Sequence, residues 1–208
     1  MSGIDRYARL QGLGLPVVTT SDAAVVWGAS LAVAARVLSR LTSSGLVVKI
    51  SHGLWQIGAQ RVDPTFVLPA LTNPYPSYIS GWTALFRYDM IEQIPHDIFA
   101  VSLGRTKRVD TSVGQFQVHH LHPQLFGGFK DETGIRAGFA RPEKALFDVV
   151  YLFSVRQGKV TLPELELPKD FDMRELQRWV SAIPSIRLKT LTTQSLDHLV
   201  AGATLQGA

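Results

Sequence analysis

Cysteine is absent from the 208 residues of this chain. Its absence excludes a disulfide framework, a thiol nucleophile, an iron–sulfur cluster and a cysteine-based zinc finger. A reducing compartment suits such a composition best, so we expect a cytoplasmic protein.

Sequence signatures of several enzyme classes are missing as well. The chain has no glycine-rich phosphate loop of either common type, no Gly-x-Ser-x-Gly elbow and no His-Glu-x-x-His zinc motif. Near the N-terminus, Thr19, Thr20, Ser21 and Asp22 interrupt the apolar run that an export signal needs after Arg6 and Arg9. The charge-free stretch 23–35 is shorter than the roughly 20 residues of a membrane helix. We therefore predict neither catalysis by these motifs nor a membrane span.

The composition that remains is that of a globular protein, with 46% hydrophobic and 18% charged residues. The formal net charge of +4 is unevenly distributed. Residues 1–61 contain six basic and two acidic groups, whereas the remainder has equal numbers of each. A positive N-terminal third joined to a neutral remainder is typical of a nucleic-acid-binding module attached to a second domain.

The N-terminal third has the pattern of a winged helix. Helices are predicted over 2–11, 21–27 and 31–43, with glycine at 12, 28 and 45 ending each one and Ser30 capping the third. The β-branched run 46–50 and a second short strand, 54–57, flank the turn Ser51-His52-Gly53 and predict a hairpin. Helix, turn, helix and hairpin in this order predict domain 1–60 as a winged helix-turn-helix.

The third helix has two distinct faces at 100° per residue. One face is predicted to pack on the core and consists of Leu31, Ala34, Ala35, Leu38 and Leu41. The opposite face includes Arg36 and Arg40, each able to bind a phosphate or a guanine edge. With residues from the wing, the predicted DNA-binding set is Ser30, Ala32, Val33, Arg36, Arg40, Ser43, Lys49 and His52. A purely structural winged helix that mediates protein contacts is the alternative.

A second, α+β domain is predicted over 77–208, after a packed connector at 61–76 that is rich in proline. Ser77 is expected to cap a helix containing Tyr78, Trp82 and Leu85. Strands are predicted at 98–103, 115–122 and 135–140, with Arg105 to Arg108 as a polar turn between the first two. Helices are expected at 142–155, 173–182 and 191–200.

Four strings resemble the AbiEi family of antitoxins, transcriptional regulators of viral defence systems. They are Gly53-Leu54-Trp55, Tyr78-Ile79-Ser80-Gly81-Trp82-Thr83-Ala84-Leu85, Gln93-Ile94-Pro95 and Arg141-Pro142-Glu143-Lys144-Ala145-Leu146-Phe147-Asp148. The resemblance spans roughly residues 5–155. It implies a two-domain, type IV antitoxin whose winged helix represses its own operon and whose C-terminal domain counters a nucleotidyltransferase-like toxin. Family wings often carry several basic residues, whereas this one has only Lys49 and His52.

Three further clusters invite a chemical role. His120 and His122 share a strand face while His119 points away, which is too few ligands for a transition metal, so we expect no metal and no other cofactor. Arg105, Lys107 and Arg108 form the densest basic run, either a phosphate-contacting or antitoxic surface or a solvated hairpin tip. Glu143 and Asp148 lie about 140° apart on a helix and cannot act as a catalytic pair.

The sequence therefore supports two functions. One is an autorepressor and antitoxin that binds double-stranded DNA with an inverted repeat in its own promoter, with a homodimer on that DNA. The alternative is an enzyme or an RNA- or nucleotide-binding module whose active surface lies in the C-terminal domain.

Overall fold

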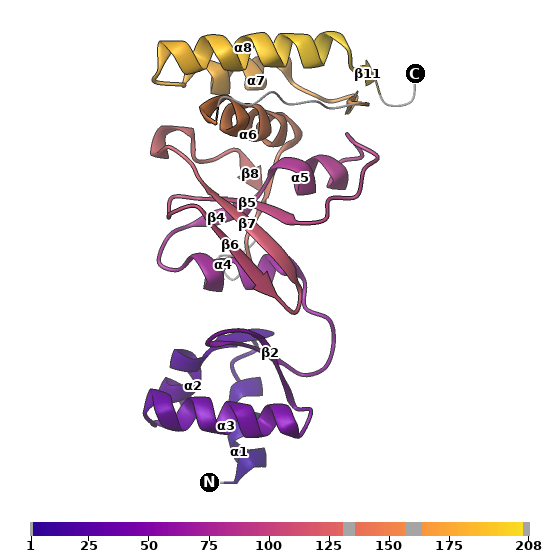
Figure 1. Cartoon of the computed structure of the whole chain (residues 1–208). Helices are drawn as coiled ribbons and strands as arrows, with labels where there is room; N and C mark the ends of the chain where they lie inside the picture. Colours follow the sequence, from indigo (N-terminus) through magenta and orange to yellow (C-terminus); the bar gives the residue numbers. More distant parts are fainter. Residues whose placement is uncertain (1, 131–135, 157–163, 206–208) are drawn as a thin grey trace.

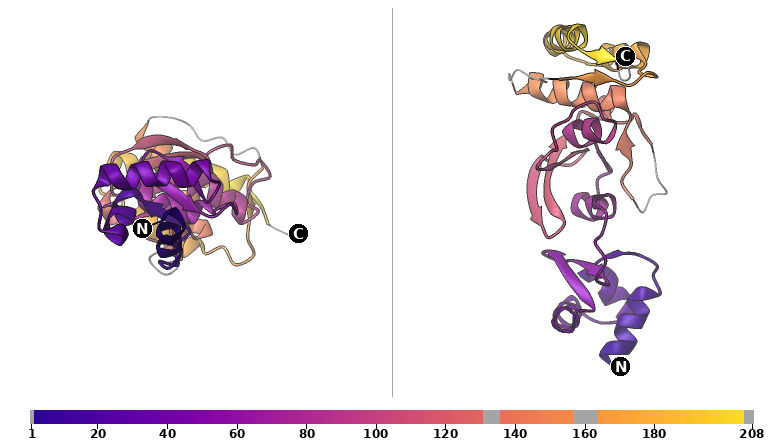
Figure 2. Two further views of the ribbon diagram at one scale, coloured as in Figure 1. Left: turned by 90° about the horizontal axis from the view of Figure 1, so that it is seen from below. Right: turned by 90° about the vertical axis from the view of Figure 1, so that its right-hand side faces the viewer.

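We describe a computed structural model of residues 2–130, 136–156 and 164–205. The molecule is elongated, with the N-terminal helices at one end and the last two helices at the other (Figures 1 and 2). Its elements belong to the α+β class, as predicted.

The N-terminal part contains three helices and a small antiparallel sheet. The helices are α1 (Gly3–Gln11), α2 (Thr20–Trp27) and α3 (Leu31–Ser43), and the strands are β1 (Val17–Thr19), β2 (Val47–Ser51) and β3 (Leu54–Ile57). The strand order is β1-β3-β2. Ser2, Thr19 and Ser30 cap the three helices with their side chains, and Gly28 ends α2 in the left-handed conformation. The helices and the hairpin thus lie at the expected residues.

Helix α3 packs on the core through a slightly different face from the one predicted. Ala34, Leu38 and Leu41 are buried as expected, and Val37 joins them. Leu31 was assigned to the core, but 58% of its surface is exposed. Leu31 is the first residue of α3. The residues before it form the loop after α2, so no preceding helical turn covers its side chain.

The C-terminal part is built on a mixed sheet with strand order β6-β7-β5-β4-β9-β8 within the described residues. Its strands are β4 (Ser77–Ile79), β5 (Ile98–Ser102), β6 (Lys107–Thr111), β7 (Gly114–His120), β8 (Phe129–Lys130) and β9 (Phe139–Ala140). The central strands β4 and β5 are antiparallel, whereas β5 pairs with β7 and β4 with β9 in parallel.

Helices cover both faces of this sheet. They are α4 (Pro64–Thr72), α5 (Gly81–Arg87), α6 (Pro142–Val155), α7 (Met173–Ser181) and α8 (Ile186–Ala201). Residues alternate along β5: Ala100 packs with α4 on one face, while Phe99 and Val101 pack with α5 and α6 on the other. Helices α7 and α8 form a further layer over α6 (Figure 1). A 3₁₀ turn (Pro123–Leu125) and the short parallel pair β10 (Glu166–Leu167) and β11 (Thr204–Leu205) complete the described elements.

Three expectations for this part were wrong. Ser77 does not cap a helix but begins strand β4, and the helix starts at Gly81. The segment from Arg105 to Arg108 is not a turn, because β6 begins at Lys107. That strand lies at the sheet edge with mostly exposed side chains, so it lacks the apolar alternation that identifies a strand. The strand expected at 135–140 is only Phe139–Ala140 within the described residues, and position 135 lies outside them.

Within the connector at 61–76, Pro64–Thr72 forms helix α4, which packs against the larger sheet. Asp63 caps α4, and Val67 and Leu68 of this helix are fully buried. Ile50 and Leu54 of the N-terminal hairpin enter the same apolar cluster, and the Ser112 amide donates to the Ile50 carbonyl over 3.0 Å. The N-terminal sheet is therefore held against the larger one through α4.

No single helix in the described ranges has both the length and the apolar composition to cross a membrane. Helices α2 and α3 satisfy those criteria only as a pair, and they are bent by 104° at the break between them.

We predict that Gly81→Ala is much more destabilising than Gly28→Ala. Both glycines have positive φ, so an alanine at either position costs about 1–2 kcal/mol in backbone strain. At Gly81 the added Cβ would also overlap the Phe99 ring, which adds roughly 1–3 kcal/mol, whereas Gly28 faces open space. Denaturant titration of both variants measures the difference, and equal losses would contradict this packing.

Candidate functional site

The exposed face of α3 presents the residues predicted to bind DNA. Ala32, Val33, Arg36, Arg40 and Ser43 are all exposed. No carboxylate of the described chain lies within ion-pair distance of either guanidinium. Because neither arginine is neutralised in this way, both charges are available to an anionic ligand. At the start of the helix, the exposed Ser30 accepts a hydrogen bond from the Val33 amide over 3.4 Å.

The predicted wing residues are also exposed. Lys49 lies on β2, with its ammonium group 5.9 Å from the centre of the Trp55 ring. His52 lies in the turn between β2 and β3, next to Gly53 at a φ of 71°. Trp55 itself is buried and donates from its indole to the Thr20 hydroxyl over 2.9 Å, which ties the hairpin to α2.

The structure does not gather Arg105, Lys107 and Arg108 into one patch. Lys107 and Arg108 are neighbours in strand β6, so their side chains point to opposite faces. The Lys107 ammonium donates to the Leu71 carbonyl over 2.6 Å, while Arg108 contacts Gln115 and lies 3.8 Å from Asp97. Arg105 is exposed in the segment before the strand.

The three histidines diverge. The ring of His120 contacts the Gly104 carbonyl, and His122 lies beyond the strand, where its Nδ1 accepts from the Gln124 amide. The expected strand at 115–122 ends at His120, so His120 and His122 do not share a strand face. In the parts of the chain that the structure covers, no three His, Cys, Asp or Glu side chains are placed to hold a metal ion.

His119 is buried, with 5% of its surface exposed. Its ring lies 4.4 Å from that of Phe99, and its Nδ1 accepts a hydrogen bond from Arg156 over 3.0 Å. A guanidinium can only donate, so this contact requires the neutral tautomer protonated at Nε2. Burial, together with the nearby Arg156 charge, lowers the pKa of His119 to about 4.

A polar cluster lies at the centre of the C-terminal core. We use the name β4–α6 cluster for Tyr78 and Ser80 with Lys144 and Asp148, all of them completely buried. One oxygen of Asp148 accepts from the Tyr78 hydroxyl at 3.0 Å and the Ser80 hydroxyl at 2.7 Å, and the other contacts the Lys144 ammonium. The two longest strings of the family resemblance thus meet at this carboxylate.

Aromatic rings enclose the lysine of this cluster. The Lys144 ammonium lies 5.6 Å from the Tyr78 ring centre, 4.9 Å from that of Phe147 and 4.8 Å from that of Trp179 on α7. Burial lowers the pKa of Lys144, raises that of Asp148 and raises that of Tyr78 well above its ordinary value. These groups bond to one another inside the core, out of reach of a substrate, so we assign them a structural role.

Sequence analysis missed this cluster because it compared Asp148 with the wrong neighbour. Glu143 faces elsewhere and accepts from the Asp172 amide over 2.8 Å, in agreement with the separation expected on a helix. Lys144 and Asp148 are four residues apart, the spacing at which helix side chains meet. That spacing was the available signal, but an i, i+4 pair is usually solvent-exposed.

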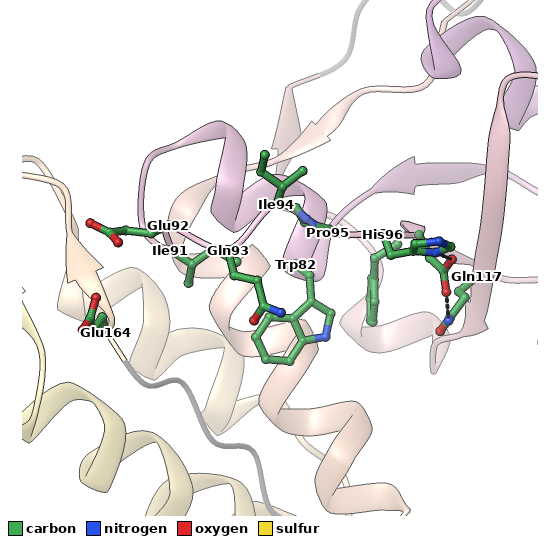
Figure 3. A pocket seen from close by; sticks show the side chains of 11 residues that line it. Trp82, Ile91, Glu92, Gln93, Ile94, Pro95, His96, Gln117 and Glu164 are labelled. Atoms are coloured by element: carbon green, nitrogen blue, oxygen red, sulfur yellow. Dashed lines mark hydrogen bonds and ion pairs between the residues drawn. The ribbon is translucent and has the colours of Figure 1, made fainter.

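An open hollow of about 740 Å³ lies beside α5 (Figure 3). Trp82 and Phe99 form its apolar wall, the string Gln93-Ile94-Pro95 forms part of its rim, and Glu92, Asp97 and Glu164 are its acidic members. Among the residues that the structure describes, no lysine or arginine lines it. A phosphate group would meet carboxylates here, so the hollow does not support the alternative of a nucleotide-binding surface.

Comparison with known proteins gave no family model that matches the chain, and no curated protein matches it. Among solved structures, one match is described as "Solution Structure of Antibiotic-Resistance Factor ANT(2'')-Ia Reveals Substrate-Regulated Conformation Dynamics". The alignment has 12% sequence identity and a TM-score of 0.30, and it covers 66% of this chain and 91% of that one. A similarity of this size carries no functional argument.

We predict that Asp148→Ala lowers the free energy of unfolding by about 3–5 kcal/mol, because it leaves the Lys144 charge buried without a partner. The double variant Lys144→Met, Asp148→Leu removes both charges and should recover much of that loss. Removing the exposed Asp197 in the same way should cost less than about 0.5 kcal/mol. Denaturant unfolding of the four proteins checks this, and a double variant no more stable than Asp148→Ala would contradict it.

We also predict that stability falls as the pH drops from about 6.5 to 4. His119 has a pKa of about 4 in the folded chain but about 6.5 when unfolded, so the unfolded state binds more protons in that range. His119→Asn keeps an acceptor for Arg156 without a titrating ring, and its stability should fall less steeply. The exposed neighbour His120 supplies the control, since His120→Asn should follow the parent. Identical pH profiles for parent and His119→Asn would refute the assignment.

Proposed function

We propose that this protein is a DNA-binding transcriptional repressor whose N-terminal part acts as a winged helix. The observation that carries the proposal is the exposed face of α3, where Arg36 and Arg40 lie one turn apart among small side chains. A helix with that surface fits the major groove, because small residues let its backbone approach and guanidinium groups bind phosphates or guanine edges.

A single copy of this surface offers few charges. Two arginines on α3, with Lys49 on the hairpin, make too few contacts for tight binding by one module. Pairing two modules on one duplex raises the effective concentration of the second, so the operator is expected to be an inverted repeat bound by two copies.

The antitoxin role in this proposal rests on the family resemblance. The resembling strings Tyr78–Leu85 and Arg141–Asp148 meet in the β4–α6 cluster, which supports a shared core for the C-terminal domain. The implied partner is a nucleotidyltransferase-like toxin from the same operon. Of the three basic residues predicted to form the antitoxic surface, Lys107 and Arg108 bond to neighbouring groups, whereas Arg105 is exposed in the segment before β6. Arg105 is therefore the cleanest position to test.

Arg36→Ala and Arg40→Ala should each weaken binding to the DNA upstream of the gene by about 1–3 kcal/mol if the arginine contacts a base. Arg187→Ala is a matched control, because that exposed arginine lies on α8 at the opposite end of the molecule (Figure 1). Titrations at several salt concentrations separate the two roles, since loss of a phosphate contact reduces the salt dependence. Parent-like affinity in both folded variants would show that α3 does not bind the operator.

Repression and protection should be separable in the full-length chain. Arg36→Ala with Arg40→Ala should abolish repression of a reporter yet protect cells during toxin expression, because both residues are remote from β6. Arg105→Glu should do the reverse if the basic run is the antitoxic surface, since it reverses an exposed charge without removing a packing contact. Loss of protection in the α3 double variant would contradict this division.

A further inference from the structure

The exposed face of α3 has a restricted chemistry. Its side chains comprise two arginines, several serines and the apolar residues Ala32 and Val33. It has no asparagine or glutamine to bind adenine, and no aspartate or glutamate to accept from the cytosine amino group. Direct contacts specific for a base are therefore limited to arginine on guanine and apolar groups on thymine, while serine accepts either partner.

The two apolar residues occupy the beginning of the helix, on the same face as the arginines. At 100° per residue, Val33 and Arg40 lie about 20° apart and Ala32 lies within about 40° of Arg36. Val33 remains 37% exposed, a large share for a β-branched apolar side chain that does not join the core. N-terminal residues of a recognition helix approach the base edges most closely, and the thymine C5-methyl is the apolar group of the major groove.

We propose that Ala32 and Val33 select thymine in the operator by packing against its C5-methyl group. This inference rests on the proposed function and specifies the DNA sequence it requires. Val33 and Arg36 are separated by about 4.5 Å along the helix axis, a little more than one base-pair step. Each half-site should therefore contain a thymine within one or two base pairs of a guanine that Arg36 contacts.

Thymine-to-uracil replacement tests this directly, because it removes the methyl group and leaves base pairing unchanged. Full-length protein is titrated with duplexes from its own upstream region in which single thymines are replaced in turn. We expect the affinity to fall about three- to tenfold at one or two positions in each half-site, because the free energy of burying one methyl group is lost. At the position that Val33 contacts, Val33→Ala should bind the thymine and uracil forms with more nearly equal affinity than the parent, whereas a position contacted by Ala32 should keep its preference.

Leu31→Ala is the matched control. Leu31 is exposed and apolar, but it lies about 140° around the helix from Arg36, so this variant should keep the parent's preference for thymine. If the parent binds uracil and thymine duplexes equally while Arg36→Ala still weakens binding, the methyl contact is overturned and the repressor function stands. If neither Arg36→Ala nor any base change alters binding, both are overturned. A Val33→Ala variant that loses self-association but keeps the thymine preference would also overturn it, because Val33 would then be a protein contact.

Discussion

The buried ion pair between Lys144 and Asp148 is the constraint on which the C-terminal part depends. Two charges removed from water must be satisfied by partners in fixed positions, and here those partners come from different elements. Strand β4 supplies the Tyr78 hydroxyl, Ser80 between β4 and α5 supplies a second hydroxyl, and α7 supplies the Trp179 ring beside the lysine. The sheet, α6 and the outer helices are thereby held in one arrangement, because sliding any of them would leave a charge without its partners.

The cluster also gives the family resemblance a physical meaning. The string Tyr78–Leu85 passes from the central strand β4 into α5, and the string Arg141–Asp148 opens the helix that packs against it. Their polar residues form the hydrogen-bonded β4–α6 cluster, and their apolar residues line the core around it. Such residues stabilise the fold, and they give no argument for a particular chemistry.

The surface proposed to bind DNA depends on a different set of interactions. Helix α3 packs on the N-terminal core through Ala34, Val37 and Leu38, and its two arginines lie on the exposed face. The hairpin beside it is anchored through Ile50 and Leu54 to the cluster shared with α4 and the larger sheet. The N-terminal hairpin and the larger sheet are therefore linked by packed apolar contacts.

Local signals in the sequence determined the N-terminal part to a large extent. Ser30 caps α3 at the predicted place, because a cap satisfies backbone donors within three residues of itself. The exposure of Arg36 and Arg40 followed from helix periodicity, which is also a local property of the sequence. The exposure of Leu31 did not follow from periodicity, since the burial of a residue at a helix end depends on which loop covers it.

The tertiary structure decided what depends on distant partners. Tyr78 has the spacing of a helix residue but forms a strand, because β5 and β9 flank it on both sides. Lys107 and Arg108 are adjacent in sequence yet separated in space, since an edge strand directs neighbours to opposite faces. The two hydroxyl partners of Asp148 lie about 70 residues away in the sequence. The periodicity of one helix cannot predict them, because only folding of the chain brings those hydroxyl groups to the carboxylate.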